Sequence, residues 1–362
     1  MDDEYGLARQ SVLGEIAAPL LDYRPRDPRG YRPAIGVIGC GGIAAHHLAA
    51  YQHAGYNVVA LCGREEGKPR ALAEKFFPEA AIHTDYLALL RRPEIEVVDI
   101  TTHPQERVAI IEAAIAAGKH ILSQKPFVLD LAVGARLVAA AEARGVQLAV
   151  NQNGRWAPHF RYLLQAVRHG LIGSLASVSC ALNWDHSWIA GTPFEEVRHL
   201  ILGDFGIHWF DLVAALFAER PATEVFARAS RAPGQPMKPP MLAHALIDFA
   251  DGQATLAFNG LSSLGQTDRT VLAGTAGTLQ SSGPSLTDQE VTLFTPAGWA
   301  KPRLEGTWFQ EGFHGAMAEL LCAIEEKREP ENSARLNLRT LALCFAALES
   351  ADSGKPVRPA IT

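Results

Sequence analysis

The sequence predicts an α/β chain of two domains, a doubly wound parallel sheet followed by an α+β domain with a large, mostly antiparallel open sheet. Its length of 362 residues exceeds the usual size of one domain. From residue 35 to residue 150, short apolar runs alternate with amphipathic stretches, a pattern typical of parallel strands covered on both faces. Later strands alternate apolar and polar residues. We therefore expect an N-terminal extension at 1–32, the doubly wound domain at 33–150 and the α+β domain at 151–362.

The N-terminal extension divides into two parts. The stretch "LARQSVLGEIAAPLL", residues 7–21, is predicted to be partly helical. The stretch "DYRPRDPRGYRP", residues 22–33, is predicted to be a linker, because its prolines and arginines discourage regular structure.

The doubly wound domain is predicted element by element from its alternating pattern. Apolar runs that read as strands lie at 35–39, 57–63, 97–102, 120–126 and 146–153, and amphipathic stretches that read as helices lie at 43–55, 68–77, 107–119 and 131–145. Strand and helix alternate throughout, so the sheet is expected to be parallel with helices on both faces.

The second domain begins with a helix at 159–170 and continues in alternating segments separated by Gly, Pro and Asp. These segments lie at 176–184, 224–230, 242–249, 253–260 and 269–274, and their period of two predicts strands with one exposed face. The C-terminal stretches 313–329 and 337–354 are predicted to be helical, with Gly354 and Pro356 as a stop signal.

Composition limits the partners and the compartment. The formal charge of −6 and the lack of a strong basic stripe give no reason to expect nucleic acid as a partner. The five cysteines have no C-x-x-C spacing, which favours reduced thiols over a disulfide framework. The N-terminus has no apolar signal core and the chain no apolar run of 18 residues, so we expect a cytoplasmic protein without a membrane partner.

A glycine-rich turn opens the doubly wound domain. Residues 39–44 fit G-x-G-x-x-G/A, with Gly39, Gly41 and Ala44 in the small positions, directly after a predicted strand and at the start of a helix. Gly39 would make the tight turn, Gly41 would let the backbone approach a pyrophosphate, and Ala44 would let the helix pack on the strand. A purely structural turn is the alternative. The context favours a Rossmann dinucleotide site.

The end of the second strand bears on the choice between NAD and NADP. The acid that normally binds the ribose hydroxyls of NAD is replaced by Gly63, and Arg64 follows. A small residue and an arginine leave room and countercharge for the 2′-phosphate of NADP. Glu65 or Glu66 as a displaced acid is the alternative, with Arg64 stacking on adenine. The prediction leans to NADP.

Two other stretches carry reactive side chains. Lys125 and Pro126 follow a strand at the carboxyl edge, where ligands bind such sheets, although a surface lysine before a turn is the plainer explanation. In "GDFGIHWFDL", Asp204, His208 and Asp211 share one face if the segment is helical. A lone histidine there is more often a core residue, but three polar groups on one stripe raise the prospect of a functional site.

In their order and spacing, four features resemble the family named for glucose–fructose oxidoreductase, inositol dehydrogenase and MocA. They are the glycine turn, the Lys125-Pro126 pair, N-x-R at 153–155 and D-x-G-x-H at 204–208. The similarity runs from about residue 34 to residue 359. It implies an NAD(P)-dependent oxidoreductase that acts on a secondary alcohol, often of a sugar or cyclitol.

Family positions match Lys125 as the catalytic lysine and Asp204 and His208 as the aspartate–histidine pair. The predicted cofactor-binding residues are Gly39, Gly41, Gly42, Ile43, Ala44, Gly63, Arg64, Thr102, Gln124, Lys125 and Asn153. Three departures stand out: Gln124 where the family most often has Glu, Arg107 where a histidine is usual, and "RHLILG" in place of the glycines that commonly precede D-x-G-x-H. The family's C-terminal sheet generally serves substrate binding and oligomer contact, so a homodimer or homotetramer is expected.

The reaction needs a base for the hydroxyl proton, and a histidine titrates near the operating pH. His208 is predicted to be this base, and Lys125 is predicted to stabilise the negative charge on the reacting oxygen. Asp204 could orient the imidazole or bind a substrate hydroxyl, and Asp211 competes with it for the orienting role.

The substrate is expected to be a sugar, cyclitol or sugar acid. The predicted substrate-binding residues are Asn153, Arg155, Trp156, Trp184, His186 and Asp211. A core or subunit-interface role is the alternative for the tryptophans, and Arg155 contacting a carboxylate would favour a uronate. Two other functions compete with this one. The first is a non-catalytic NAD(P)-binding regulator of the same fold. The second is a metal enzyme whose ligands would be Asp204, His186, His199 and His208, but their spacing fits no specific ligand pattern, so no metal is predicted.

Overall fold

The computed structural model describes residues 13–218 and 220–360, and the strands in these ranges form two sheets. The first is parallel, in the order β3-β2-β1-β4-β5-β6. Its strands are β1 (Ala34–Ile38), β2 (Asn57–Cys62), β3 (Ala81–His83), β4 (Ile95–Ile100), β5 (His120–Gln124) and β6 (Leu148–Asn151). The predicted doubly wound sheet is therefore present, including the short β3, which the apolar pattern did not indicate.

Helices connect these strands and cover the sheet: α1 (Gly42–Ala54), α2 (Gly67–Phe76), α3 (Tyr86–Leu90), α4 (Pro104–Ala116) and α5 (Leu131–Arg144). The helix α5 begins where the Asp130 carboxylate accepts from the N–H groups of Ala132 and Val133, and it ends at Gly145, whose φ of 73° suits glycine. The strands are apolar on both faces because helices lie on both sides, and this places every β-to-α turn at one edge of the sheet.

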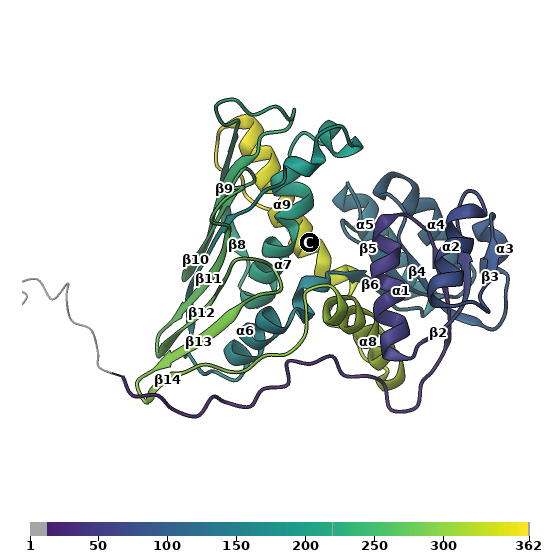
Figure 1. Cartoon of the computed structure of the whole chain (residues 1–362), viewed down its shortest axis with the longest axis horizontal. Coiled ribbons are helices and arrows are strands. Elements are labelled where there is room, and N and C mark those ends of the chain that lie inside the picture. The colour runs from purple at the N-terminus through teal and green to yellow at the C-terminus, as the bar shows by residue number, and fades with distance from the viewer. Residues whose placement is uncertain (1–12, 219, 361–362) are drawn as a thin grey trace, which may run out of the picture.

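The second sheet follows the order β14-β13-β12-β11-β7-β10-β9-β8 and is antiparallel except where β10 pairs with β7. Its strands are β7 (Leu175–Asn183), β8 (Ala222–Ser230), β9 (Leu242–Phe249), β10 (Gly252–Asn259), β11 (Thr267–Gly274), β12 (Gly277–Gly283), β13 (Glu290–Thr295) and β14 (Gly298–Ala300). Buried and exposed residues alternate along β9, as expected of a sheet with one face in water. In Figure 1 the helices α6 (Pro158–Arg168), α7 (Ile207–Leu216) and α9 (Ala334–Ser353) lie between this sheet and the first one.

The predicted helix at 7–21 is wrong in its described part, and residues 1–12 lie outside the described residues. Residues 13–33 run as an extended segment along both sheets (Figure 1). Ile16 N–H donates to Trp299 O beside β14, while Glu325 accepts from the backbone of residues 29–31. Pro19 also lacks the N–H that a helix interior needs. Contacts with Trp299 in β14 and with the helical residue Glu325, rather than local propensity, therefore determine the path of this segment.

The C-terminal helices connect the two halves of the molecule. Phe313 and Met317 of α8 (Gln310–Glu326) share a buried cluster with Ile35 and Val37 of β1, and Leu338 of α9 packs in another cluster below the first sheet. The chain thus returns to the first sheet after completing the second, and the domain boundaries drawn from sequence stay a prediction. No helix in residues 13–218 and 220–360 is long and apolar enough to cross a membrane.

Candidate active site

The glycine turn lies at the carboxyl edge of the first sheet and borders a cavity of about 630 Å³. Gly39 has a φ of 104°, and a Cβ there would lie 2.8 Å from Thr102 N, so another residue would strain the turn. A Cβ on Gly41 would meet nothing within 4 Å, and the residue faces the cavity. Backbone N–H groups at the start of α1 are thus open to a phosphate. Ala44 is fully buried, and with Gly42 and Ile43 it forms the first turn of α1.

Gly63, Arg64 and Thr102 also line this cavity, together with Glu65 and Lys68. A Cβ on Gly63 would lie 3.0 Å from Pro69 Cδ and 3.2 Å from Glu65 O, so a side chain at this position would require these neighbours to shift by a few tenths of an ångström. Arg64 pairs with the exposed Glu106. Of the two candidate acids, Glu65 reaches the cavity, whereas Glu66 pairs with Arg70 in α2.

Lys125 follows β5 at the same edge, and its main chain is held from two sides. Arg107 is fully buried and donates to the carbonyl oxygens of Gln124, Pro126 and Thr102. Burial lowers the pKa of Arg107 to about 9, which still leaves it charged at neutral pH. The side-chain Oε1 of Gln124 accepts from the N–H of Lys125 at 2.7 Å. Arg107 thus fixes the backbone of the lysine loop.

The segment around Asp204 begins with a π-helical turn, Ile201–Phe205, that leads into α7. Gly206 N–H donates to Ile201 O at 2.7 Å, and a Cβ on Gly206 would lie 2.8 Å from Leu202 O, which explains the glycine. The Asp204 carboxylate lies 3.0 Å from Lys125 Nζ, and Asp204 O accepts from the same ammonium at 2.8 Å. The π turn places Asp204 outside the regular helix, whereas His208 and Asp211 lie three residues apart within α7. The shared face expected of one continuous helix therefore stays a prediction for Asp204.

His208 is partly exposed, but its Nδ1 is buried and has no hydrogen-bond partner among the described residues. A Cβ on Gly154 would lie 3.5 Å from this Nδ1, and the ring of Trp308 stands perpendicular to the imidazole at 5.5 Å between centroids. Burial, reinforced by the charge of Lys125, lowers the pKa of His208 well below its usual value of 6.5. The imidazole is therefore neutral at physiological pH.

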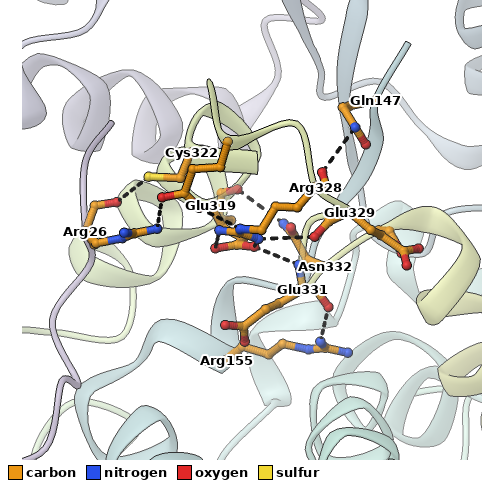
Figure 2. A network of polar contacts seen from close by, with 12 residues as sticks. Arg26, Gln147, Arg155, Glu319, Cys322, Arg328, Glu329, Glu331 and Asn332 are labelled. Carbon is orange, nitrogen blue, oxygen red and sulfur yellow. Dashed lines mark hydrogen bonds and ion pairs between the residues drawn. The ribbon is translucent and has the colours of Figure 1, made fainter. Parts of the chain in front are cut away.

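Arg155 and Asp211, two of the predicted substrate residues, are buried and bind each other. Arg155 Nε and an NH2 group bind both oxygens of Asp211 at 2.5 and 2.8 Å, and Thr340 of α9 donates to the same carboxylate at 2.8 Å. Figure 2 shows Arg155 reaching the backbone of Glu331, which accepts at 2.5 Å. Burying an arginine without a partner of opposite charge costs free energy, and Asp211 is the partner that Arg155 has here. Asp211 is thus not available to orient His208.

The structure separates the other predicted substrate residues into two groups. Trp156 is a core residue, because a Cβ on Gly315 would lie 2.2 Å from its ring and Arg161 covers its face. His186 stacks on Phe205 at 3.9 Å, next to Asp204, and packs perpendicular to Trp184. Asn153 is buried below the start of α8, where a Cβ on Gly312 would lie 2.8 Å from Asn153 O.

The residues of the competing metal site are not gathered together. His199 binds Asp352 at 2.7 Å, and Asp204 binds Lys125. Within the part of the chain that the structure describes, no group of three or more His, Cys, Asp or Glu side chains is arranged to hold a metal ion.

Trp308 was missed by sequence reasoning, although it packs against His208, Trp209 and His159. It lies in an irregular segment before α8, about a hundred residues from the D-x-G-x-H motif, and a Cβ on Gly154 would lie 2.9 Å from its ring. No local pattern marks such a residue. The glycine inside N-x-R was the available signal, because a residue without a side chain often admits a close neighbour.

Buried histidines make stability depend on pH, and His159 and His186 contribute alongside His208. Burial lowers the pKa of His159 to about 3 and that of His186 to about 4, whereas both titrate near 6.5 in an unfolded chain. Between these values the unfolded state binds more protons, so the free energy of unfolding should fall as the pH drops from 7 to 5, by up to about 1.4 kcal/mol per pH unit and histidine. Urea unfolding at both pH values measures the slope. His159→Asn should make the slope smaller, because His186 and His208 still contribute, and a wild-type protein equally stable at both pH values would contradict the expectation.

Comparisons with known proteins bear on this site. Residues 34–152 match the model of the oxidoreductase family with an NAD-binding Rossmann fold, and residues 160–280 match that of the GFO/IDH/MocA C-terminal domain. The chain is 29% identical over 335 residues to a D-apiose dehydrogenase of Paraburkholderia graminis, covering 89% of this chain and 88% of that protein. It is 27% identical to inositol 2-dehydrogenase 1 of Saccharopolyspora erythraea, over 51% of this chain and 54% of that protein.

Solved structures share the whole arrangement of two sheets. An oxidoreductase from Agrobacterium radiobacter, crystallised with NAD+, L-tartaric acid and magnesium, superposes with a TM-score of 0.81. The match covers 91% of this chain and 98% of that one at 23% sequence identity, which speaks to the fold alone.

Proposed function

The chain belongs to the GFO/IDH/MocA oxidoreductase family and is an NAD(P)-dependent dehydrogenase of CH–OH groups; on that premise we propose that its substrate is a neutral sugar or cyclitol. The acting residues in this proposal are Lys125, Asp204 and His208. One observation carries it: the ammonium of Lys125 lies 3.0 Å from the Asp204 carboxylate and close enough to lower the pKa of His208. Lys125 directly follows β5, at the edge of the first sheet where the glycine turn also lies.

The cavity fits a dinucleotide. Gly41 leaves the backbone accessible, and the N-terminus of α1 is free of side-chain caps among the described residues. Gly39, Gly41 and Thr102 would hold the pyrophosphate that joins the two nucleosides. Arg64 and Lys68 would hold the adenosine part. When bound, the nicotinamide supplies the hydride acceptor or donor.

The neutral imidazole of His208 is suited to act as the base in alcohol oxidation. Its buried Nδ1 leaves Nε2 on the accessible part of the ring, so Nε2 would take the proton of the substrate hydroxyl. Lys125 would donate a hydrogen bond to the same oxygen and stabilise the negative charge that develops there. Asp204 contacts Lys125 rather than His208, so in this proposal it orients the ammonium.

The residues near this cluster favour a neutral polyol. Arg155, the residue that would have bound a substrate carboxylate, is neutralised by Asp211, which removes the argument for a uronate. His186 and Trp184 offer ring faces and buried nitrogens that lack partners among the described residues. The names of the relatives point the same way, since one acts on D-apiose and another on inositol.

A direct test combines binding and turnover. Fluorescence titration with NADH and NADPH is expected to show binding, and a panel of neutral sugars, cyclitols and sugar acids should yield turnover of a neutral member, read from the absorbance of the reduced nicotinamide. Turnover confined to sugar acids would contradict the proposed substrate class. Binding without turnover of any substrate would instead favour the non-catalytic regulator.

We further propose that the cavity prefers NADP, because Arg64 and Lys68 border it and position 63 carries a glycine in place of an acid. The double variant Arg64→Ala/Lys68→Ala should weaken NADPH binding by about tenfold relative to NADH, since only NADPH carries the 2′-phosphate. Arg70→Ala is a matched control, an exposed arginine of α2 that pairs with Glu66. Equal weakening of both dinucleotides would rule out the preference.

A further inference from the structure

A fully buried polar cluster lies below the Lys125 loop, and the function proposed above does not use it. Its centre is His47 of α1, which is 0% exposed. His47 Nδ1 lies 2.7 Å from the Oδ2 of Asp99 in β4, and the hydroxyl of Tyr51 donates to the same oxygen at 2.8 Å. On the other side of the ring, Nε2 lies 3.2 Å from Gln124 Nε2 and 3.0 Å from Asn151 Nδ2. The cluster therefore joins α1 to the carboxyl ends of β4, β5 and β6.

The hydrogen bonds fix the protonation of this imidazole. Gln124 Oε1 accepts from the backbone N–H of Lys125, so the amide nitrogen of Gln124 is the atom that faces His47. An amide nitrogen only donates, and His47 Nε2 must therefore accept. Nδ1 then carries the proton and donates it to Asp99. A glutamate at position 124, the more usual family residue, would place an acceptor against this lone pair.

The same contacts determine the position of Lys125. Arg107 holds the carbonyl groups of Gln124 and Pro126, and the Gln124 side chain holds the N–H between them. An unpaired NH2 group at this buried position would cost free energy, so the acceptor that His47 supplies favours the orientation in which Oε1 of Gln124 faces Lys125. The backbone of Lys125 is thus held at the Gln124 carbonyl, at its own N–H and at the Pro126 carbonyl, and its side chain reaches Asp204 from there.

We propose that His47 is a positioning residue of the active site: by accepting from Gln124 with Nε2, it holds the Gln124 side chain against the N–H of Lys125 and so fixes the lysine for catalysis. The catalytic part of this inference rests on the function proposed for Lys125. Misplacing a catalytic group by about 1 Å costs up to roughly a hundredfold in rate.

Two conservative variants separate this role from a purely structural one. His47→Gln places a carbonyl oxygen near the position of Nε2, so it keeps the acceptor for Gln124 and loses the donor to Asp99. His47→Asn keeps a donor near Nδ1 and loses the acceptor. If His47 positions Lys125, His47→Asn is the more damaging variant. If His47 serves only to donate a hydrogen bond to the buried Asp99, the order is reversed.

Hydrogen exchange of the Lys125 amide, followed by mass spectrometry of the peptide around Pro126, provides a measurement that does not depend on activity. Exchange at this amide should be about tenfold or more faster in His47→Asn than in the wild-type protein and nearly unchanged in His47→Gln. Equal protection in the two variants, or faster exchange in His47→Gln, would overturn the proposal.

Turnover tests the consequence for catalysis. With a substrate identified by the panel, kcat should fall roughly tenfold to a hundredfold in His47→Asn, with the dissociation constant for the dinucleotide within about threefold of wild type. Gln124→Met should show the same loss, and the double variant His47→Asn/Gln124→Met should lose no more than either single variant. An unchanged kcat despite faster exchange would overturn the catalytic part. A wild-type protein without any turnover would count against the proposed function, while the exchange data would still decide whether His47 positions Lys125.

Discussion

Lys125→Met is expected to lower kcat for alcohol oxidation by about a hundredfold to a thousandfold, the usual scale for losing a donor to the reacting oxygen. Methionine keeps the approximate length of the side chain but removes the charge that lies 3.0 Å from Asp204. The comparison is made with kcat of wild type and variant under saturating dinucleotide. Lys75→Met, on α2 and outside the site, is the control.

The same variant carries a second signature. The charge of Lys125 contributes to lowering the pKa of His208, so its removal should move the acidic limb of the kcat/KM profile to higher pH. Turnover near the wild-type level would mean that Lys125 does not contact the reacting group. A large loss of turnover without any shift of this limb would mean that the charge of Lys125 does not influence the base.

His208→Gln is expected to lower kcat by roughly a hundredfold or more, because glutamine fills part of the space of the imidazole and cannot accept the hydroxyl proton. Binding of NADH or NADPH, followed by fluorescence, should be preserved, since His208 lies outside the residues that line the dinucleotide cavity. The acidic limb of kcat/KM, which in the wild-type protein should lie well below pH 6.5, should disappear with the imidazole.

A matched control distinguishes this loss from a packing effect. His159 is also buried against Trp308, at 5.8 Å between ring centroids, but belongs to α6 and the core. His159→Gln should therefore retain most of the turnover. If the two variants lose activity equally, His208 acts through the packing of Trp308 rather than as a base.

The glycine turn and the alternation of strands and helices were predictable because both are local signals. Gly39 adopts a positive φ that glycine tolerates, and the apolar strands reflect a sheet buried on both faces. The order of motifs predicted the family, and the periodicity of the apolar residues predicted the parallel and antiparallel sheets. The N-terminal helix failed for the opposite reason, because residues 13–33 follow contacts with Trp299 and Glu325 that no local pattern reveals.

The sequence by itself determined the fold class, the dinucleotide turn and the lysine, aspartate and histidine of the candidate site, since each is marked by short spacing or residue type. Only the tertiary structure decided which charged and polar side chains contact one another. Arg155 and Asp211 are 56 positions apart and neutralise each other, and His47 joins residues from three strands. A buried polar group must find a partner within about 3 Å, wherever the fold brings one, and sequence spacing does not contain that distance.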